Sequence, residues 1–408
     1  MNIWLISKYA GLPKYGLGSK LFFLAREFVR NGHNALLITS DANHLAEFPK
    51  TDERYNHEDV DGITVRWIKT RKYRETASAG RVLSWVDFEQ ALFRMPRKSL
   101  PRPEVVIISS LSLLSVVYGY YLKRVYGAIL VFEVRDIWPL TMVAEGGFSR
   151  WHPLVLILGM IEKYGYRKAD LVVGTMPRLD LHVREAIGYD RPFHCSPLGY
   201  APEWITDETP LPEEFLRQYF PEGKFIVGYA GSIGITNALE PFMECIERLS
   251  GRVDIHFVLV GSGDLKNAYM ARLSGHTNVS FVPRIEKAAV PSFLRRCDVL
   301  YLAAHDSPVW RFGQSLNKLM DYMLSGKPVI ASYSGYQSML NEARCGVFVD
   351  ANDALALTEV VVRFVEMPAQ GRQQMGQKGR NWVLANRSYE VLGKEYLAVL
   401  EEQTRTRG

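Results

Sequence analysis

The sequence predicts an α/β protein in which two Rossmann-like, doubly wound domains face each other across a cleft. Short apolar runs alternate with segments of helical periodicity, a pattern typical of parallel sheets covered by helices on both faces. The alternation stops at residues 200–222, which are rich in Pro, Glu and Asp, and then starts again. The chain has 408 residues, enough for two domains of roughly 150 to 200 residues each. We therefore expect a first domain at residues 1–200, a second at residues 223–385, and a C-terminal helix at residues 386–408 that packs back on the first domain.

The first domain is predicted to begin with an apolar strand, "NIWLIS", followed by a glycine-bearing loop and a helix over "SKLFFLAREFVRNGH". Continuous apolar runs predict its further strands at residues 34–40, 104–110, 128–134 and 169–175. The second domain repeats this order, with a strand and glycine loop at residues 224–234 and a helix at residues 237–249. Its further strands are predicted at residues 255–263, 279–284, 298–304, 327–332 and 345–350.

Composition favours a globular protein of a reducing compartment. The net charge of +5 is too small to indicate a nucleic-acid partner. The four cysteines show neither metal-ligand spacing nor a disulfide framework. The chain starts without a charged segment and long apolar core, so we expect no signal peptide. The apolar run "PLVLILGMI" at residues 153–161 stops at Glu162, short of the ~18 apolar residues that a membrane span needs. A cytoplasmic location is therefore expected.

A first candidate ligand loop follows the first predicted strand. Gly16 and Gly18, in "KYGLGSK", allow a backbone to approach a ligand closely, and Ser19 or the helix start behind it can receive a phosphate. The spacing is not the three-glycine dinucleotide fingerprint, which disfavours a nicotinamide-dependent oxidoreductase. A plain tight turn is the alternative interpretation of this loop.

A second candidate loop, "EVRDIWP", ends another apolar strand of the first domain. Burying charged residues in such a place costs free energy unless they are solvated, paired or in contact with a ligand. Arg135 and Asp136 can form a salt bridge, or Asp136 can accept a hydrogen bond from a substrate hydroxyl.

Two further glycine loops follow strands of the second domain. Gly231, Ser232 and Gly234, in "YAGSIGITN", are expected to offer backbone N–H groups to phosphate oxygens. The loop "GSGDLK" at residues 261–266 is a weaker signal, since glycines and an acid after a strand are common turn chemistry.

The segment "GQSLNKLMDYMLSGKPVIAS" predicts a loop, an amphipathic helix and a buried strand. Asn317 and Lys318 fall near the start of the helix, where backbone N–H groups are unpaired and an anion can bind. Asp321 adds one acid to an otherwise apolar helix. An ordinary helix and strand of an α/β core is the alternative.

Taken in order, these pieces resemble the retaining nucleotide-sugar glycosyltransferases of family 4, which have the two-domain GT-B fold. The resemblance covers nearly the whole chain and includes "LAREFVRNGHNALLIT", "ADLVVGTMPRL", "SPLGY", "GYAGSIG", "FVLVGSGD", "VSFVPR" and "NKLMDYMLSGKPVIAS". The combination of "VRDIWP" with "NKLMDY" looks most like the subgroup that builds bacterial surface polysaccharides, such as O-antigen and capsule.

The resemblance implies that the first domain binds the acceptor and the second the nucleotide sugar. We expect a UDP-sugar donor, with an amino sugar or a deoxysugar, and a polyprenyl-diphosphate-linked saccharide acceptor. The catalytic residues are expected to be Asp136, Arg311 and Lys318. The donor-binding residues are expected to be Gly16, Gly18, Gly231, Ser232, Gly234, Arg284, Gly313, Ser315, Asn317 and Asp321.

The family pattern also implies a role for the predicted helix at residues 317–325. Its N-terminus points at the donor diphosphate, Lys318 counters phosphate charge, and Asp321 takes the place of a glutamate that binds the ribose. A second family acid, which holds hydroxyls of the donor sugar, falls on Gly313. An arginine and a lysine of the family fall on uncharged residues around Ser232 and Asn237, so Arg311 and Lys318 are expected to supply that charge.

No metal is expected, since no D-x-D motif lies near these loops. No cofactor is expected either, because helix N-termini, loop amides and cations can stabilise a diphosphate leaving group. Three alternatives remain. The first is a nucleotide-sugar epimerase, which shares this architecture. The second is a nicotinamide-dependent oxidoreductase, which is disfavoured because its three-glycine fingerprint is missing. The third is a catalytically silent binding subunit, which Gly313 suggests.

A basic and aromatic segment at residues 66–98 predicts contact with an anionic membrane surface. Its bases outnumber its acids, and its aromatic residues are of the types that settle at a membrane–water boundary. The bases are Arg66, Lys69, Arg71, Lys72, Arg74, Arg81, Arg94, Arg97 and Lys98, the acids Glu75, Asp87 and Glu89, and the aromatic residues Trp67, Tyr73, Trp85, Phe88 and Phe93. We therefore expect a peripheral protein on the inner face of the cytoplasmic membrane. A solvated basic face with aromatic residues in the core is the alternative.

Overall fold

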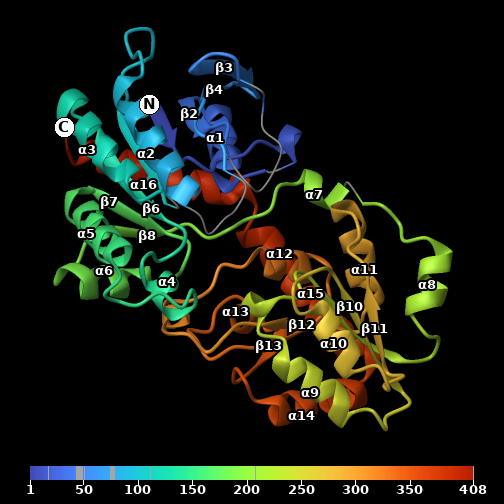
Figure 1. The fold of residues 1–408 in the computed structure, drawn as a ribbon. Coiled ribbons are helices and arrows are strands. Elements are labelled where there is room, and N and C mark those ends of the chain that lie inside the picture. Colours follow the sequence, from blue (N-terminus) through green and yellow to red (C-terminus); the bar gives the residue numbers. More distant parts are fainter. Residues whose placement is uncertain are drawn as a thin grey trace. The chain divides into compact units, whose positions relative to one another are not determined.

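The computed structural model describes residues 1–16, 18–42, 49, 51–73, 79–110, 112–206 and 208–407. They form two compact α/β units (Figure 1). The first unit contains Met1–Gly199 together with Tyr389–Gly408, and the second contains Tyr200–Ser388.

The first unit is built on an eight-stranded sheet of order β3-β4-β2-β1-β5-β6-β7-β8, parallel except for the edge pair β3 and β4. Its strands are β1 (Asn2–Ile6), β2 (Asn34–Ser40), β3 (Tyr55–Val60), β4 (Ile63–Ile68), β5 (Val105–Ser109), β6 (Ile129–Val134), β7 (Leu171–Gly174) and β8 (Phe193–Cys195). Its helices are α1 (Lys20–Arg30), α2 (Ala79–Arg94), α3 (Ser115–Tyr126), α4 (Leu140–Ala144), α5 (Pro153–Lys168), α6 (Leu179–Ile187) and α16 (Tyr389–Arg405). Every residue of β5 and β6 is buried, as expected for central parallel strands.

The sequence analysis missed three strands, β3, β4 and β8. A two-residue turn at Asp61 and Gly62 joins β3 to β4, and both residues have positive φ angles, 53° and 79°. An Asp-Gly pair between two alternating segments is a strong local signal of a hairpin. That signal is present in "YNHEDVDGITVRWI" and identifies the antiparallel edge of the sheet.

A buried ion pair ties the first helix of this unit to the middle of its sheet. The Lys20 ammonium lies 3.1 Å from the Glu133 carboxylate, and both side chains are sealed from solvent. Lys20 also donates to the Ser196 carbonyl at 2.6 Å, and Ser109 donates to Glu133 at 3.0 Å. Because each charge has a partner and further hydrogen bonds, the pair can remain buried.

The C-terminal helix α16 belongs to the first unit, where it packs along α1. The rings of Phe23 and Tyr389 stack at 4.8 Å, and those of Phe28 and Tyr396 meet edge to face at 5.8 Å. Gly393 lies against Glu27, where a larger residue would collide with the glutamate side chain.

The second unit has a six-stranded, fully parallel sheet of order β11-β10-β9-β12-β13-β14. Its strands are β9 (Phe225–Ala230), β10 (Ile255–Val260), β11 (Val279–Val282), β12 (Val299–Ala303), β13 (Val329–Ser332) and β14 (Gly346–Val349). Its helices are α7 (Glu203–Thr206), α8 (Glu213–Tyr219), α9 (Glu240–Arg248), α10 (Lys266–Arg272), α11 (Val290–Arg296), α12 (Asn317–Leu324), α13 (Leu340–Ala343), α14 (Ala354–Glu366) and α15 (Ala369–Asn386). The strand order reverses between β9 and β12, the kind of place where ligands bind in open α/β sheets.

Residues 200–222, expected as a linker with a short helix, lie in the second unit. The Thr209 amide donates to the Ala288 carbonyl, and the Leu211 amide to the Ser292 hydroxyl. Phe220 packs edge to face on Phe293 of α11 at 5.7 Å. Apolar side chains therefore attach this polar-looking segment to α11.

The basic and aromatic segment at residues 66–98 differs from the prediction. Trp67, Trp85 and Phe88 are core residues, so these three side chains cannot reach lipid, and that part of the prediction is wrong. Their apolar rings fill the space beside the sheet, as the alternative interpretation held. Arg74 and Glu75 lie outside the described residues. Among the residues that the structure describes, none of the helices combines the length and apolar composition of a membrane crossing.

Candidate functional site

A cavity of about 480 Å³ opens in the second unit at the carboxyl ends of β9, β10 and β11 and beside α12. Parallel strands place their following loops at one edge of the sheet, which explains why residues distant in sequence meet there. The cavity is lined by Ala230, Gly231, Ser232, Val260, Gly261, Ser262, Arg284, Ile285, Lys287, Val290, Lys318 and Asp321.

Two glycine loops form the floor of this cavity and fit into each other. A Cβ atom on Gly261 would collide with the Gly231 carbonyl, and one on Gly263 would collide with the Ile233 carbonyl. The Ile233 amide donates to the Ser262 carbonyl at 2.9 Å, which fixes the two loops together. Glycine is therefore required for close packing at these positions.

The structure corrects the expected role of the Gly231 amide. Its N–H donates to the Val260 carbonyl at 3.0 Å as the sheet ends, so it is not available to a phosphate. Gly231 instead leaves room for the Lys318 side chain, whose Cε occupies the place that a Cβ on Gly231 would take.

Lys318 crosses from α12 to the end of β9. Its ammonium donates to the Tyr229 hydroxyl at 2.8 Å and to the Asn237 amide oxygen. It also lies 4.8 Å from the centre of the Tyr229 ring. Among the described residues no carboxylate forms an ion pair with it, and burial lowers the pKa of Lys318 to about 8. This lysine is thus held in place by neutral groups, and within the described residues no carboxylate neutralises its charge.

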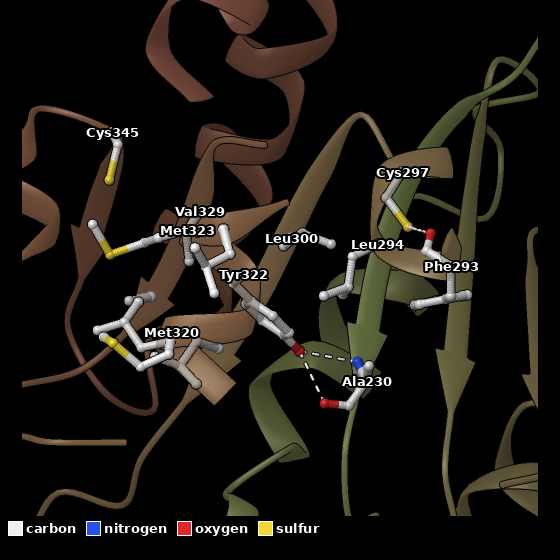
Figure 2. Packing of buried hydrophobic residues seen from close by; sticks show 14 of the residues in the cluster. Ala230, Phe293, Leu294, Cys297, Leu300, Met320, Tyr322, Met323, Val329 and Cys345 are labelled. Carbon is white, nitrogen blue, oxygen red and sulfur yellow. Dashed lines mark hydrogen bonds between the residues drawn. The ribbon is translucent and has the colours of Figure 1, made fainter. Parts of the chain in front are cut away.

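Tyr322, one turn after Lys318, fixes α12 to β9 (Figure 2). Its hydroxyl accepts a hydrogen bond from the Ala230 amide at 2.9 Å and donates one to the Ala230 carbonyl at 3.2 Å. The ring is buried among apolar side chains of the sheet and of α11. Because residues one turn apart share a helix face, this anchor also sets the position of Lys318.

Asp321 is the acid of the cavity. Burial raises the pKa of the Asp321 carboxyl to about 6, against the opposing charge of Lys287. No hydrogen bond to this carboxylate is found within the described parts of the chain. An acid that is desolvated and unpaired in a cavity is a candidate ligand contact.

The charge around the cavity favours an anion. The cationic side chains that line it are Arg284, Lys287 and Lys318, and Asp321 is its acid. Arg284 and Lys287 are exposed at the rim, whereas Lys318 is half-buried. The arrangement can bind a ligand with both negative charge and hydroxyl groups.

A second cavity of about 270 Å³ adjoins the first and shares Lys287, Val290 and Asp321 with it. Trp204 of α7 lines this second cavity, and the Lys287 ammonium lies 4.6 Å from the centre of its ring. The first turn of α7, in the segment expected as a linker, is therefore a wall of the site region.

Several predicted site residues come together here, and others do not. Gly231, Ser232, Arg284, Lys318 and Asp321 line the larger cavity. The residues that were predicted for this site but are absent from its lining are Gly234, Arg311, Gly313, Ser315 and Asn317.

The residues absent from the lining have local structural roles or lie at the surface. A Cβ on Gly234 would collide with the Asp264 carboxylate. Arg311 is exposed and its guanidinium lies 4.6 Å from the Phe312 ring centre, so its expected role stays a prediction. Gly313 has φ 101°, a conformation that favours glycine, and Asn317 is exposed at the start of α12.

The predicted residues of the first unit occupy loops after β1 and β6. Gly16 has φ 80° and ends a short 3-10 turn. Gly18 lies under the Phe23 ring. The Ser19 hydroxyl caps α1 and donates to the Gly11 carbonyl at 2.9 Å, so its expected availability for a phosphate is not supported. Asp136 is exposed beyond the end of β6.

Sequence reasoning missed Tyr229, Tyr322 and Lys287. The spacing of a tyrosine within an apolar strand or helix is the same whether it belongs to the core or to a site. The sequence therefore did not distinguish Tyr229 and Tyr322 from ordinary core residues. Lys287 could have been found, because it follows Arg284 by three residues after a predicted strand. Among the described residues no group of three or more His, Cys, Asp or Glu side chains could hold a metal ion.

Comparison with known proteins agrees with this architecture. Residues 16–199 match a family model described as a glycosyl transferase 4-like domain, and residues 224–367 match one described as glycosyl transferases group 1. A curated relative is 26% identical over 160 residues, which are 38% of this chain and 42% of the relative. It is the GDP-mannose-dependent monoacylated alpha-(1-6)-phosphatidylinositol monomannoside mannosyltransferase of Corynebacterium glutamicum. The match thus spans less than half of that relative.

Solved structures share the fold over almost the full length. Sucrose-phosphate synthase from Thermosynechococcus elongatus has a TM-score of 0.75 at 16% identity, with 99% of each chain covered. Trehalose 6-phosphate synthase from Burkholderia multivorans has a TM-score of 0.73 at 12% identity, covering 100% of this chain and 99% of that one. Anabaena HepE, in complex with UDP and glucose, has a TM-score of 0.65 at 14% identity, covering 98% and 100%.

The Tyr322 anchor leads to a first prediction. Tyr322→Phe keeps the ring but leaves buried groups of Ala230 without their partner, so we expect the free energy of unfolding to fall by about 1–3 kcal/mol. We also expect weaker binding of pyrophosphate, because α12, which carries Lys318, loses its hydrogen bonds to Ala230 and is held less firmly against β9. Urea denaturation and isothermal titration calorimetry measure the two effects. The matched control is Tyr301→Phe, which loses a hydrogen bond to Ser332 in the core that packs around Phe242. Tyr301→Phe should lower the free energy of unfolding and leave pyrophosphate affinity unchanged. If Tyr322→Phe also leaves pyrophosphate affinity unchanged, the anchoring role is contradicted.

Proposed function

Since this chain belongs to the GT-B glycosyltransferases, with a 4-like domain followed by a group 1 domain, we propose that it transfers a sugar from a UDP-sugar to a lipid-linked saccharide. The observation that carries the proposal is Lys318, held over Gly231 with no carboxylate partner among the described residues and followed one turn later by Asp321. Such a site offers a cation for a diphosphate and a carboxylate for a ribose within one cavity.

The donor is proposed to lie along the cavity in a fixed order. The diphosphate meets Lys318 at the end of β9, with Arg284 at the rim. Lys318 and Asp321 are three residues apart on one helix face, so the ribose next to the diphosphate reaches the carboxylate. The base then lies against the apolar side chains of Ile285 and Val290, which line the same cavity.

Transfer breaks the bond between the anomeric carbon and the diphosphate oxygen, and the electron pair stays with the diphosphate. The anomeric carbon forms its new bond to the oxygen of an acceptor hydroxyl, whose proton passes to the departing diphosphate. Lys318 stabilises the negative charge that develops there, in a site where water is partly excluded and a cation acts more strongly. Asp136 is proposed to accept a hydrogen bond from a substrate hydroxyl. Retention of the anomeric configuration and independence from metal are proposed from the family resemblance.

The sugar and the acceptor are proposed from two features. Gly313 stands where the family has an acid for hydroxyls of the donor sugar, which suits an amino sugar or a deoxysugar. The name of the corynebacterial relative gives its acceptor as an acylated phosphatidylinositol mannoside, itself a lipid-linked sugar. We propose a polyprenyl-diphosphate-linked saccharide of surface polysaccharide synthesis, such as O-antigen or capsule. The enzyme would then act at the inner face of the cytoplasmic membrane.

The direct test is transfer of label. A panel of radiolabelled nucleotide sugars is incubated with the protein and with polyprenyl-diphosphate saccharides, with and without excess EDTA. We expect a labelled lipid product from a UDP-sugar and equal turnover with the chelator. Epimerised donor without transfer, or binding without any product, would overturn the proposal. Activity that is lost with EDTA and restored by Mg²⁺ or Mn²⁺ would refute metal independence.

The roles of the two α12 residues can be separated by ligand. Lys318→Ala should weaken UDP binding by about tenfold to 150-fold, since each charge-assisted hydrogen bond is worth about 1.5–3 kcal/mol. Uridine, which lacks the phosphates, should bind almost as before. Asp321→Ala should weaken both ligands through the ribose. Calorimetry with UDP and uridine measures these differences, and equal losses for both ligands in Lys318→Ala would contradict the assignment.

Donor affinity should fall both at alkaline and at acidic pH, for two different reasons. Lys318 loses its charge as the pH rises through its pKa of about 8, which removes the attraction for the diphosphate. Asp321 is protonated as the pH falls through its pKa of about 6, which removes an acceptor for the ribose hydroxyls. UDP affinity is therefore expected to be highest between these values. Lys318→Arg should abolish the alkaline decrease and Asp321→Asn the acidic one. If both decreases in affinity persist in these variants, the titration of other groups causes them.

A further inference from the structure

The first unit carries a cluster of exposed apolar side chains around the start of α5, which we term the α5 patch. Its members are Phe148, Trp151, Leu156, Ile157 and Met160, exposed to 38%, 69%, 47%, 48% and 65%. Large apolar side chains in this number and this proximity are unusual on a protein surface and mark an interaction site.

Helix geometry explains how the α5 patch remains unpartnered. Leu156, Ile157 and Met160 are spaced one, three and four residues apart and therefore lie on one face of α5. The opposite face, with Val155, Leu158, Glu162, Gly165 and Tyr166, is buried in the unit. The apolar run thus contributes to two faces of the helix, and the described residues cover only one of them.

Basic side chains continue the same stripe toward the end of α5. Lys163 and Arg167 are exposed, at positions three and seven after Met160. Arg150 is exposed before the helix, and its guanidinium lies 4.9 Å from the centre of the Trp151 ring.

Few acidic side chains accompany these bases between residues 145 and 168. Glu162 points inward, where its carboxylate accepts from Tyr166 at 3.0 Å and contacts His182 at 2.7 Å. Between residues 145 and 168, Glu145 is the acid that remains exposed. The surface therefore combines apolar side chains, an exposed tryptophan and positive charge.

We infer that the α5 patch docks the first unit on the surface of an anionic lipid bilayer. An amphipathic helix with apolar residues on one face and Lys or Arg beside them lies in the plane of the interface. Trp151 has the amphipathic ring that settles at the headgroup level, and the basic residues complement anionic lipid. A helix of 16 residues with charges in its last turns is too short to cross a bilayer, so it lies on the surface.

The place of the α5 patch in the unit suits a lipid-linked acceptor. The chain leaves β6 at its carboxyl end and passes through α4, and the Phe148 amide donates to the Met142 carbonyl of that helix at 3.1 Å. The start of α5 is therefore near the sheet edge at which Asp136 stands. The use of the patch for an acceptor rests on the proposed function, whereas binding to lipid does not.

The test is co-sedimentation of the full chain with vesicles. Wild-type protein is expected to bind vesicles of phosphatidylglycerol and phosphatidylethanolamine, more weakly at 1 M salt, and to bind phosphatidylcholine vesicles poorly. The variant Trp151→Ser/Ile157→Ser/Met160→Ser should reduce the partition coefficient at least tenfold. Lys163→Glu/Arg167→Glu should reduce binding to the anionic vesicles and remove its salt dependence.

The matched control is Val253→Ser/Leu355→Ser, which changes apolar residues of the second unit that are 82% and 56% exposed. It should bind vesicles like the wild type. UDP affinity should be unchanged in every variant, which also shows that each is folded. Wild-type vesicle binding in the triple variant would overturn the inference. So would a lipid-free dimer that the triple variant converts to monomer, because the patch would then bind a second copy. Absence of sugar transfer, with vesicle binding intact, would count against the proposed function alone.

Discussion

Parallel pairing of every strand in the six-stranded sheet is the constraint on which the cavity beside α12 depends. Each strand must be followed by a crossover to begin the next, so the loops after β9, β10 and β11 all emerge at one edge. The order reverses between β9 and β12, and α12 follows β12 beside that reversal. Lys318 and Gly231 are far apart in sequence and meet for this reason. The two glycine loops then pack directly against each other below the cavity.

Two lysines near helix starts show how the surroundings of a charge separate structure from function. Lys20 lies at the start of α1 and is paired with Glu133 inside the first unit, so its charge is satisfied by the fold. Lys318 lies at the start of α12, and within the described residues its contacts are the neutral groups of Tyr229 and Asn237. A desolvated cation without a counter-ion is costly, and its lowered pKa reflects that cost. An anionic ligand would supply the missing negative charge, which is why we propose that Lys318 binds the donor diphosphate.

The surface of the first unit shows that apolar sequence does not reveal which side of a helix is covered. The aromatic residues at 66–98 suggested a membrane surface, yet Trp67, Trp85 and Phe88 fill the core. The run at residues 153–161 was too short to span a membrane, yet part of it is exposed as the α5 patch. Burial depends on neighbouring elements, since only packing decides whether an apolar side chain faces the sheet or solvent.

The sequence by itself determined the α/β class, the repeat of two domains and most strand positions, because continuous apolar runs and helical periodicity are local signals. It also singled out Lys318 and Asp321, which the structure places in the lining of one cavity, since a charge near a helix start is visible in the chain. The tertiary structure alone decided that Gly231 makes room for Lys318 and that Tyr322 anchors α12. It also decided that Arg311 is absent from the lining of the cavity and that residues 200–222 join the second unit. These outcomes depend on contacts between segments that are distant in sequence, and such contacts leave no local pattern from which they could be predicted.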